Sequence, residues 1–424
     1  MKKLVFILLV VISYQVSAQI NFDDYFISKT LRLDYTRAGN HDTSFVYFEQ
    51  LKQEPYWGGS HVNLIDKFNL GDYRVMLYDS TGTKLLYSRG YSSLFCEWTD
   101  TKEAKTVSRS YYESVVMPFP KNDVILKLQD RDRNNVFHTV FEYKINPNSY
   151  FIVKDNKDKY SIEKIYGTGK PEVSLDIVVL PEGYTEKEMG KFKKDVARFV
   201  SYFFKVQPFK DNKKKVNFWI VNAASAESGT DIPRKNIWKN TILNTHFDTF
   251  GSERYLTSRD VNQMRNLASY TPYDQIYILV NSSIYGGGGI YNYYNLCISD
   301  HQYSEQVFTH EFGHAFAALA DEYEYGVDNA DEFYNMDVEP WQVNITNLVD
   351  FDSKWKNMLD KNTPVPTPDT KEYENKIGAF EGAGYVSKRV YRPTHDCKMK
   401  TNQMNEFCPV CLKAVSEMLK FYTE

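Results

Sequence analysis

The residues best able to do chemistry lie in one segment, 309–314, which reads T-H-E-F-G-H. Histidines four positions apart on a helix share one face about 6 Å apart, so His310 and His314 can converge on one zinc ion. Glu311, beside that face, can take a proton from the water that the metal activates and pass it to a leaving amine. The other interpretation is two core histidines and a buried, paired glutamate, but burying that carboxylate without a metal is costly. The spacing therefore predicts a catalytic zinc site.

A catalytic zinc needs a third protein ligand and an open coordination position. Asp321, seven residues after His314, is the nearest candidate. On an unbroken helix it would lie about 10 Å further along the axis, so the helix is expected to end or bend at 317–319. In metzincin proteases a glycine permits that turn and the third ligand follows after six residues, whereas here the spacing is one longer and the glycine is missing. Glu322 and Glu381 therefore stay open as alternatives to Asp321.

The domains that hold these residues are expected to follow an N-terminal signal peptide. Lys2 and Lys3 precede the apolar run 4–12, and the stretch 16–18 has small residues at the positions that a signal peptidase recognises. This pattern predicts a signal peptide at 1–18. The run is shorter than the ~20 residues of a membrane span, so we expect no integral membrane span. We expect a periplasmic, cell-surface or secreted protein.

The composition is that of a folded protein without a nucleic-acid partner. Hydrophobic residues make up 42% and charged residues 25% of the 424 residues, which excludes bulk disorder and fibrous architectures. Lysine and arginine number 51 against 55 acidic residues, so no basic surplus exists to neutralise phosphates. The aromatic content of 16% favours β-rich structure.

Two domains are expected after the leader. Residues 19–162 read as short strands with turn signals, which predicts an N-terminal all-β sandwich. Residues 163–424 read as strands alternating with helices, which predicts an α/β, mixed-sheet domain. The strands expected in the second domain are 175–180, 216–221, 275–280 and 290–298, and the glycines 286–289 are expected to break the chain before the last of them. The helices expected are 185–204 and 414–422, the first opened by Thr185 as N-cap with Glu188 three residues on.

Five cysteines are present, namely Cys96, Cys297, Cys397, Cys408 and Cys411. In an exported protein the last three, which lie close in sequence, are expected to hold a disulfide, which leaves at least one thiol over. The other interpretation is a structural zinc site formed by these three cysteines with His395.

The stretch 310–323, H-E-F-G-H-A-F-A-A-L-A-D-E-Y, resembles the bacterial IgA peptidase family of zinc metallopeptidases. Further similar stretches are 176–184, 285–292, 380–383, 391–393, 397–399 and 407–411, so the resemblance spans about 165–424. The region before it resembles the β domain that often precedes this catalytic domain. The resemblance implies a metzincin-like zinc endopeptidase with His310 and His314 as ligands and Glu311 as general base, and it leaves the substrate open.

Three further roles are hypotheses. Met399 is expected either as a hydrophobic floor beneath the zinc, like the Met-turn of metzincins, or as a core methionine. The stretch 290–296 is expected either as an exposed edge strand that binds extended peptide or, with its glycines, as a flexible turn. Tyr391 or Tyr323 is a candidate to stabilise the tetrahedral oxyanion.

The function predicted is an exported zinc endopeptidase that acts on a protein or peptide substrate, with Zn²⁺ as cofactor. One alternative is a surface glycan- or protein-binding protein whose metal is structural. Another is a zinc amidase or exopeptidase that acts on cell walls or peptide termini. The cleavage specificity and the oligomeric state stay open.

Overall fold

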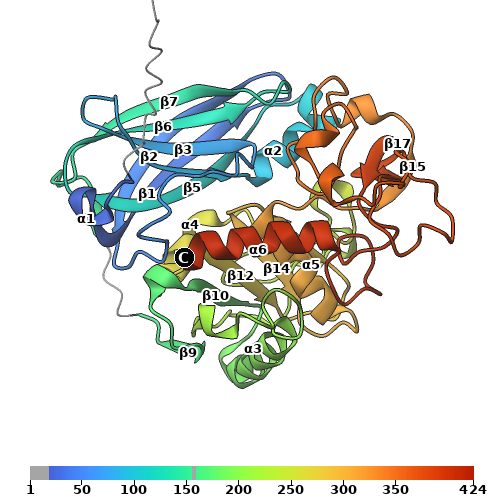
Figure 1. The fold of residues 1–424 in the computed structure, drawn as a ribbon. Helices are drawn as coiled ribbons and strands as arrows, with labels where there is room; N and C mark the ends of the chain where they lie inside the picture. The colour runs from blue at the N-terminus through green and yellow to red at the C-terminus, as the bar shows by residue number, and fades with distance from the viewer. Residues whose placement is uncertain (1–18, 155–158) are drawn as a thin grey trace, which may run out of the picture.

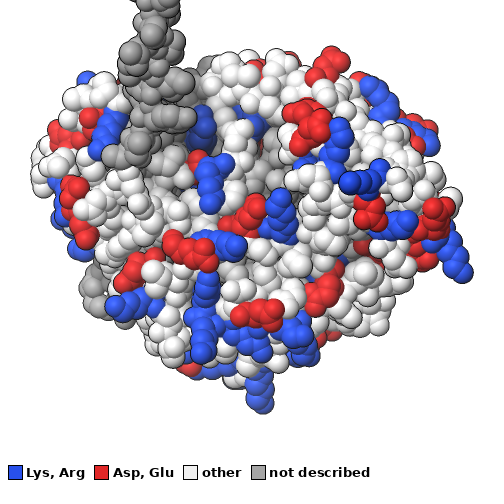
Figure 2. Space-filling view, in the orientation of Figure 1, with Lys and Arg blue, Asp and Glu red and all other residues white. Residues whose placement is uncertain are grey.

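The protein is described by a computed structural model over residues 19–154 and 159–424. The predicted signal peptide lies outside the described residues. The N-terminal strands form a β-rich layer that lies over a second part built from a sheet and the longer helices (Figure 1). None of the helices in the described part of the chain is both long and apolar enough to cross a bilayer. Basic and acidic side chains are interspersed over the face drawn in Figure 2.

The N-terminal part consists of two four-stranded sheets, with strand orders β5-β1-β2-β8 and β4-β3-β6-β7. Their strands are β1 (Phe26–Gly39), β2 (Ser44–Glu54), β3 (Tyr73–Asp79), β4 (Leu85–Tyr91), β5 (Arg109–Pro120), β6 (Val124–Arg131), β7 (Phe137–Ile145) and β8 (Val153–Lys154). Leu33 of the first sheet and Leu77 and Leu126 of the second are buried in one shared core. The N-terminal region is therefore β-rich, as the turn signals predict. Two short helices, α1 (Phe22–Tyr25) and α2 (Leu94–Thr99), accompany the sheets.

The second part is built on a six-stranded sheet of order β13-β14-β12-β10-β11-β9. Its strands are β9 (Ile162–Tyr166), β10 (Leu175–Glu182), β11 (Val216–Val221), β12 (Gln275–Val280), β13 (Gly287–Ile290) and β14 (Tyr294–Ile298). The four central strands run parallel, while β9 and β13 are antiparallel to their neighbours at the two edges. The expected mixed α/β architecture is therefore present. The predicted domain boundary at 162/163 falls at the first residue of β9.

Helices cover the sheet on both faces, which explains the continuous apolar run in β10. Its residues alternate between two cores: Ile177 and Val179 pack with α3 (Met189–Phe203), α5 (Ser304–Ala317) and α6 (Pro409–Thr423), whereas Val178 and Leu180 pack with α4 (Val261–Ala268) and α2. A strand covered on both faces needs apolar residues at every position. The second core contains residues of α2 and β5, so it also joins the N-terminal part to the sheet.

Most predicted elements of the second part are present, but one strand was predicted wrongly. Strands 216–221 and 275–280 have the predicted bounds. The expected helix 185–204 is a 3-10 turn followed by α3, opened by a capping box of Thr185 and Glu188. The single strand expected at 290–298 is instead a hairpin of β13 and β14 that turns at Asn292. The glycines expected to break the chain lie partly in the edge strand, where they allow a close approach to α5.

A three-stranded sheet lies beside the end of α5. It has the order β15-β17-β16, with β15 (Glu324–Val327), β16 (Phe380–Ala383) and β17 (Tyr385–Arg392). The chain between these strands is mostly irregular. This small sheet begins directly after the segment that carries Asp321, so it helps to position the candidate site.

Candidate metal centre

Helix α5 carries the two histidines and ends where the ligand spacing predicts. Phe312 and Phe316 stack 4.9 Å apart on its buried side. The helix stops at Ala317, and Ala318 takes a left-handed conformation with φ of 53°. The Ala318 N–H donates to the carbonyl of His314 at 2.9 Å, which satisfies one of the last carbonyls of the helix. An alanine thus makes the turn that a glycine makes in metzincins, and the chain reverses toward Asp321.

The structure brings His310, His314 and Asp321 together. The Nε2 atoms of the two histidines lie 3.1 Å apart, and they lie 3.1 and 3.2 Å from Oδ1 of Asp321. Metal–ligand bonds of 2.0–2.1 Å in a tetrahedral zinc site separate the ligand atoms by about 3.3 Å. The three atoms therefore have the spacing of three corners of a zinc tetrahedron. Their convergence forms a candidate metal site in the described chain.

Hydrogen bonds to backbone carbonyls orient the two histidines. Nδ1 of His310 lies 2.9 Å from the Lys398 carbonyl, and Nδ1 of His314 lies 2.5 Å from the Leu319 carbonyl. Since a carbonyl only accepts, each Nδ1 carries the proton and each Nε2 presents a lone pair to the shared point.

The two oxygens of the Asp321 carboxylate have different partners. Its Oδ2 accepts hydrogen bonds from the hydroxyls of Tyr323 at 2.8 Å and Tyr385 at 2.6 Å. Its Oδ1 is buried and has no hydrogen-bond partner among the described residues except the two imidazoles that it faces. One oxygen is therefore held by tyrosines while the other is directed at the metal position.

The electrostatics of the cluster favour a cation. Burial lowers the pKa of His314, but the carboxylate of Asp321 outweighs burial and raises that pKa to about 9. Burial likewise raises the pKa of Asp321, but the two imidazoles outweigh it and hold the pKa well below its usual value. Both shifts have the direction that a positive charge between these side chains stabilises. The residues therefore fit a divalent cation.

Glu311 lies on α5 beneath the glycines of β13. A Cβ added to Gly287 would lie 2.6 Å from Oε1 of Glu311, and one added to Gly289 would lie 2.3 Å from its carbonyl oxygen. The edge strand can therefore contact the helix only because these positions lack side chains. Burial raises the pKa of Glu311, and the positive charge of the two histidines lowers it in part. A carboxylate with a raised pKa is suited to accept and return a proton.

Met399 lies under the same helix. It is fully buried, and a Cβ added to Gly313 would lie 2.7 Å from its sulfur. The residue before it, Lys398, accepts the hydrogen bond of His310, and the Met399 carbonyl accepts the N–H of Glu322 at 2.9 Å. Met399 is thus a core residue that also lies beneath the histidine-bearing turn of the helix.

Several sequence candidates lie elsewhere. Glu322 points into a separate cluster of cysteines, and Glu381 is exposed and pairs with Lys388 at 3.2 Å. In the described part of the chain, the tyrosines that hydrogen-bond to Asp321 are Tyr323 and Tyr385, and Tyr391 is not one of them. The backbone of Tyr391 pairs with Thr346 and Glu381 instead.

The peptide-binding strand suggested for 290–296 also changes. The edge strand is β13, whereas β14 lies inside the sheet between β13 and β12. Part of the outer edge of β13 is covered, because Tyr255 bridges to Gly287.

Some site residues gave no usable signal in the sequence. Tyr385 follows Asp321 by 64 positions, and one tyrosine among 33 does not stand out. Arg254 donates to the hydroxyl of Tyr323 at 2.9 Å and belongs to no motif. The glycines 286–289 do stand out in the sequence, but they predict a chain break and not an edge strand packed on α5.

Comparisons with known proteins identify the family. The model of the family described as IgA Peptidase M64 matches residues 163–376 and 369–419. The chain belongs to the M64 peptidase family. A second model, described as Peptidase M64 N-terminus, matches residues 21–142 of this M64 peptidase. A comparison with curated proteins finds no match. The family makes the protein a metallopeptidase with a protein or peptide substrate, and the matched regions contain both the β-rich part and the histidine cluster.

Proposed function

We propose that this M64 peptidase is an exported zinc endopeptidase that uses His310, His314 and Asp321 as metal ligands and Glu311 as general base. The observation that carries the proposal is that two imidazole nitrogens, from the helix that also bears Glu311, and one carboxylate oxygen, from the loop after it, lie within 3.2 Å of one another. Two imidazoles and a carboxylate suit zinc, and three protein ligands leave a coordination position open for catalysis. When bound, zinc supplies Lewis acidity, which polarises the scissile carbonyl and lowers the pKa of water.

The residues of the chain supply the rest of the chemistry. The carbonyls of Lys398 and Leu319 keep the protons of His310 and His314 on Nδ1, so the imidazoles remain neutral ligands. Glu311 accepts the proton of the attacking water and later transfers it to the leaving amine. Its buried position, with a raised pKa, keeps the carboxylate basic enough for the first transfer and acidic enough, once protonated, for the second.

Matched glutamate variants test the role of Glu311. Bound zinc and hydrolysis of unstructured proteins and blocked peptides are measured for the wild type, Glu311→Gln and the control Glu381→Gln. We expect Glu311→Gln to keep its zinc and to lose about 10²–10⁴-fold in kcat/KM, since general base catalysis contributes about that much. Glu381 is exposed and paired with Lys388, so its variant should behave as the wild type.

Two results would contradict the proposal. Unchanged hydrolysis by a zinc-loaded Glu311→Gln enzyme removes Glu311 as the base. Cleavage restricted to free peptide termini or to cell-wall amides, with blocked internal sites left intact, replaces the endopeptidase by the exopeptidase or amidase alternative.

A further inference from the structure

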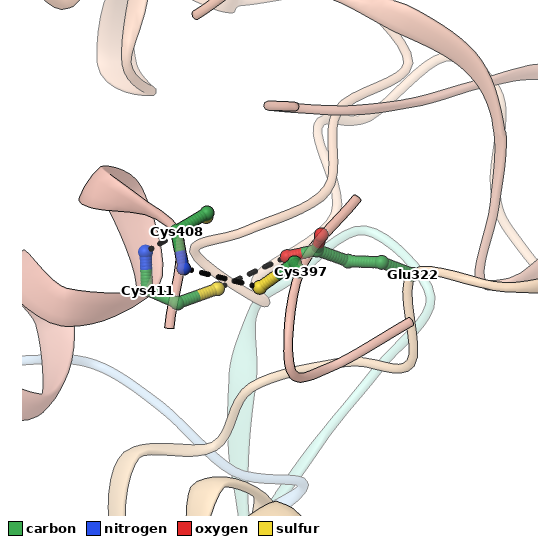
Figure 3. A group of neighbouring side chains, drawn as sticks. All are labelled: Glu322, Cys397, Cys408 and Cys411. Carbon is green, nitrogen blue, oxygen red and sulfur yellow. Dashed lines mark hydrogen bonds between the residues drawn. The ribbon is translucent and has the colours of Figure 1, made fainter. Parts of the chain in front are cut away.

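A second group of ligand-type side chains lies beside the histidine cluster. It comprises Glu322, Cys397, Cys408 and Cys411, and one ligand atom from each lies within 4.8 Å of the others. Figure 3 shows the four side chains converging from the loop after α5, the segment before Met399 and the start of α6. None is more than 6% exposed. We call this group the cysteine–glutamate cluster.

The carboxylate in this cluster is buried, and no lysine, arginine or histidine of the described residues forms an ion pair with it. Glu322 is 0% exposed. Its Oε1 accepts from Nδ2 of Asn344 at 2.9 Å and from Sγ of Cys411 at 3.0 Å. Its Oε2 is buried and has no hydrogen-bond partner among the described residues. A fully buried carboxylate is costly unless a cation or several hydrogen bonds compensate its charge.

Backbone N–H groups point at two of the three sulfurs, whereas the third, on Cys411, donates to Glu322. The N–H of Cys408 donates to Sγ of Cys397 at 3.3 Å, and the N–H of Met399 lies 3.5 Å from the same sulfur. Within the C-P-V-C segment, the N–H of Cys411 lies 3.5 Å from Sγ of Cys408, which caps the N-terminus of α6. Backbone donors and a helix N-terminus stabilise a negatively charged sulfur, the form in which cysteine binds a metal.

The sequence offered a different fourth ligand, and the structure corrects it. The side chain of His395 pairs with Asp369 at 3.0 Å on the surface and is not part of the cluster. The fourth donor is Glu322, which is adjacent in sequence to the metal-site residue Asp321. The two neighbouring carboxylates therefore point into two different clusters.

We propose that Glu322, Cys397, Cys408 and Cys411 bind a second, structural zinc ion, separate from the hydrolytic one. Three thiolates and one carboxylate complete a tetrahedron, so this site has no open position and is not expected to catalyse a reaction. The competing arrangement is a disulfide within the cluster. The structure has all five cysteines as free thiols. A disulfide would use two sulfurs and would leave the buried carboxylate of Glu322 without a cation, so zinc accounts for more of the observed arrangement.

The second site shares its backbone with the first. The Glu322 N–H donates to the Met399 carbonyl, and the Lys398 carbonyl, one residue earlier, receives the hydrogen bond of His310. Zinc bound between Glu322 and Cys397 therefore ties together the two segments that hold Asp321 and His310. This zinc would therefore hold the backbone that positions Asp321 and His310, and it would also hold the start of α6 against that backbone.

The first test uses the full-length wild-type protein. We expect two zinc ions per chain after purification and five free thiols when the protein is denatured with a chelator under non-reducing conditions. Cobalt substitution should give a thiolate-to-cobalt charge-transfer band in the near ultraviolet, because only the second site has sulfur ligands. A missing charge-transfer band, or two thiols lost to a disulfide, would overturn the proposal, because both readouts report on the cysteine–glutamate cluster alone.

Variants then assign the metal to this cluster. Cys411→Ser should lose one zinc ion per chain and the cobalt band, whereas Cys297→Ser, at a buried thiol in β14, should keep both. Unchanged zinc content in Cys411→Ser would refute the assignment, and if that variant does not fold, the wild-type cobalt spectrum still decides. Glu311→Gln should keep both zinc ions and the cobalt band while losing hydrolysis, so the two proposals can fail separately.

Discussion

The contact between β13 and α5 yields the sharpest test of how the fold holds the candidate site. Gly289 faces the backbone of the histidine-bearing helix, where an added Cβ would lie 2.3 Å from the Glu311 carbonyl oxygen and 3.1 Å from Cβ of His314. Cβ atoms essentially never approach another heavy atom closer than 3.0 Å, so the strand and the helix must separate by about 0.7 Å, the difference between 3.0 and 2.3 Å. The nearest atoms belong to the backbone of Glu311, so the clash cannot be relieved by moving a flexible side chain.

The expected effect of Gly289→Ala follows from that displacement. Overpacking of a close-packed contact destabilises a protein by about 1–3 kcal/mol. A displacement approaching 1 Å between catalytic groups and substrate can reduce turnover by about 10²-fold. We therefore expect the free energy of unfolding, measured by urea denaturation, to fall by about 1–3 kcal/mol, and kcat/KM to fall by about one to two orders of magnitude.

Gly190→Ala is the matched control. Gly190 lies in the first turn of α3, and a Cβ added there would have nothing within 4 Å. Alanine is favoured over glycine inside a helix by roughly 0.5–1 kcal/mol, so this variant should be slightly more stable and fully active. Wild-type stability and hydrolysis in Gly289→Ala would show that β13 does not constrain α5, which refutes the argument.

Two further predictions concern the surroundings of the site. Tyr385→Phe removes the 2.6 Å hydrogen bond to Asp321, so it should weaken zinc binding by about 10–100-fold in a chelator competition. The control Tyr150→Phe, at an exposed tyrosine, should bind zinc as the wild type does. Equal zinc affinities of the two variants would exclude an orienting role for Tyr385. Glu97 of α2 accepts a hydrogen bond from the hydroxyl of Tyr255, the residue that bridges to Gly287 of β13. Burial raises the pKa of the Glu97 carboxyl from 4.5 to about 7, so the protonated carboxyl stabilises the fold fully below pH 4.5, and this stabilisation is lost as the pH rises through 7. Urea unfolding from pH 5 to 8 should therefore show the wild type losing up to about 3 kcal/mol relative to Glu97→Gln, and parallel pH profiles would contradict this.

Local patterns determined much of the fold because their physical cause is local. The buried strands β11 and β12 have the predicted bounds, since a short apolar run between turn signals suffices to define a covered strand. The capping box of Thr185 and Glu188 marked the start of the helical segment that contains α3, because both partners lie within one turn. The β13–β14 hairpin was missed because glycines normally break strands, and only the contact with α5 explains their position here.

The cysteines show where a sequence pattern stops being sufficient. Their spacing suggested a disulfide or a zinc site with His395, which is the nearest histidine in sequence. The structure has three free thiols around Glu322, a residue 75 positions before Cys397. Proximity in sequence was a poor guide because the three segments meet only after α5, the Met399 segment and α6 have packed together.

The sequence by itself determined the chemistry that the helix can carry, because His310 and His314 share a face through helical periodicity alone and Glu311 follows directly. It also required the helix to end at 317–319 if Asp321 is the third ligand, since an unbroken helix carries Asp321 too far from the histidines. Only the tertiary structure decided which of two adjacent carboxylates faces the histidines. That choice depends on Tyr385 and on the cysteines around Glu322, which are distant in sequence and act through packing and hydrogen bonds that no local pattern encodes.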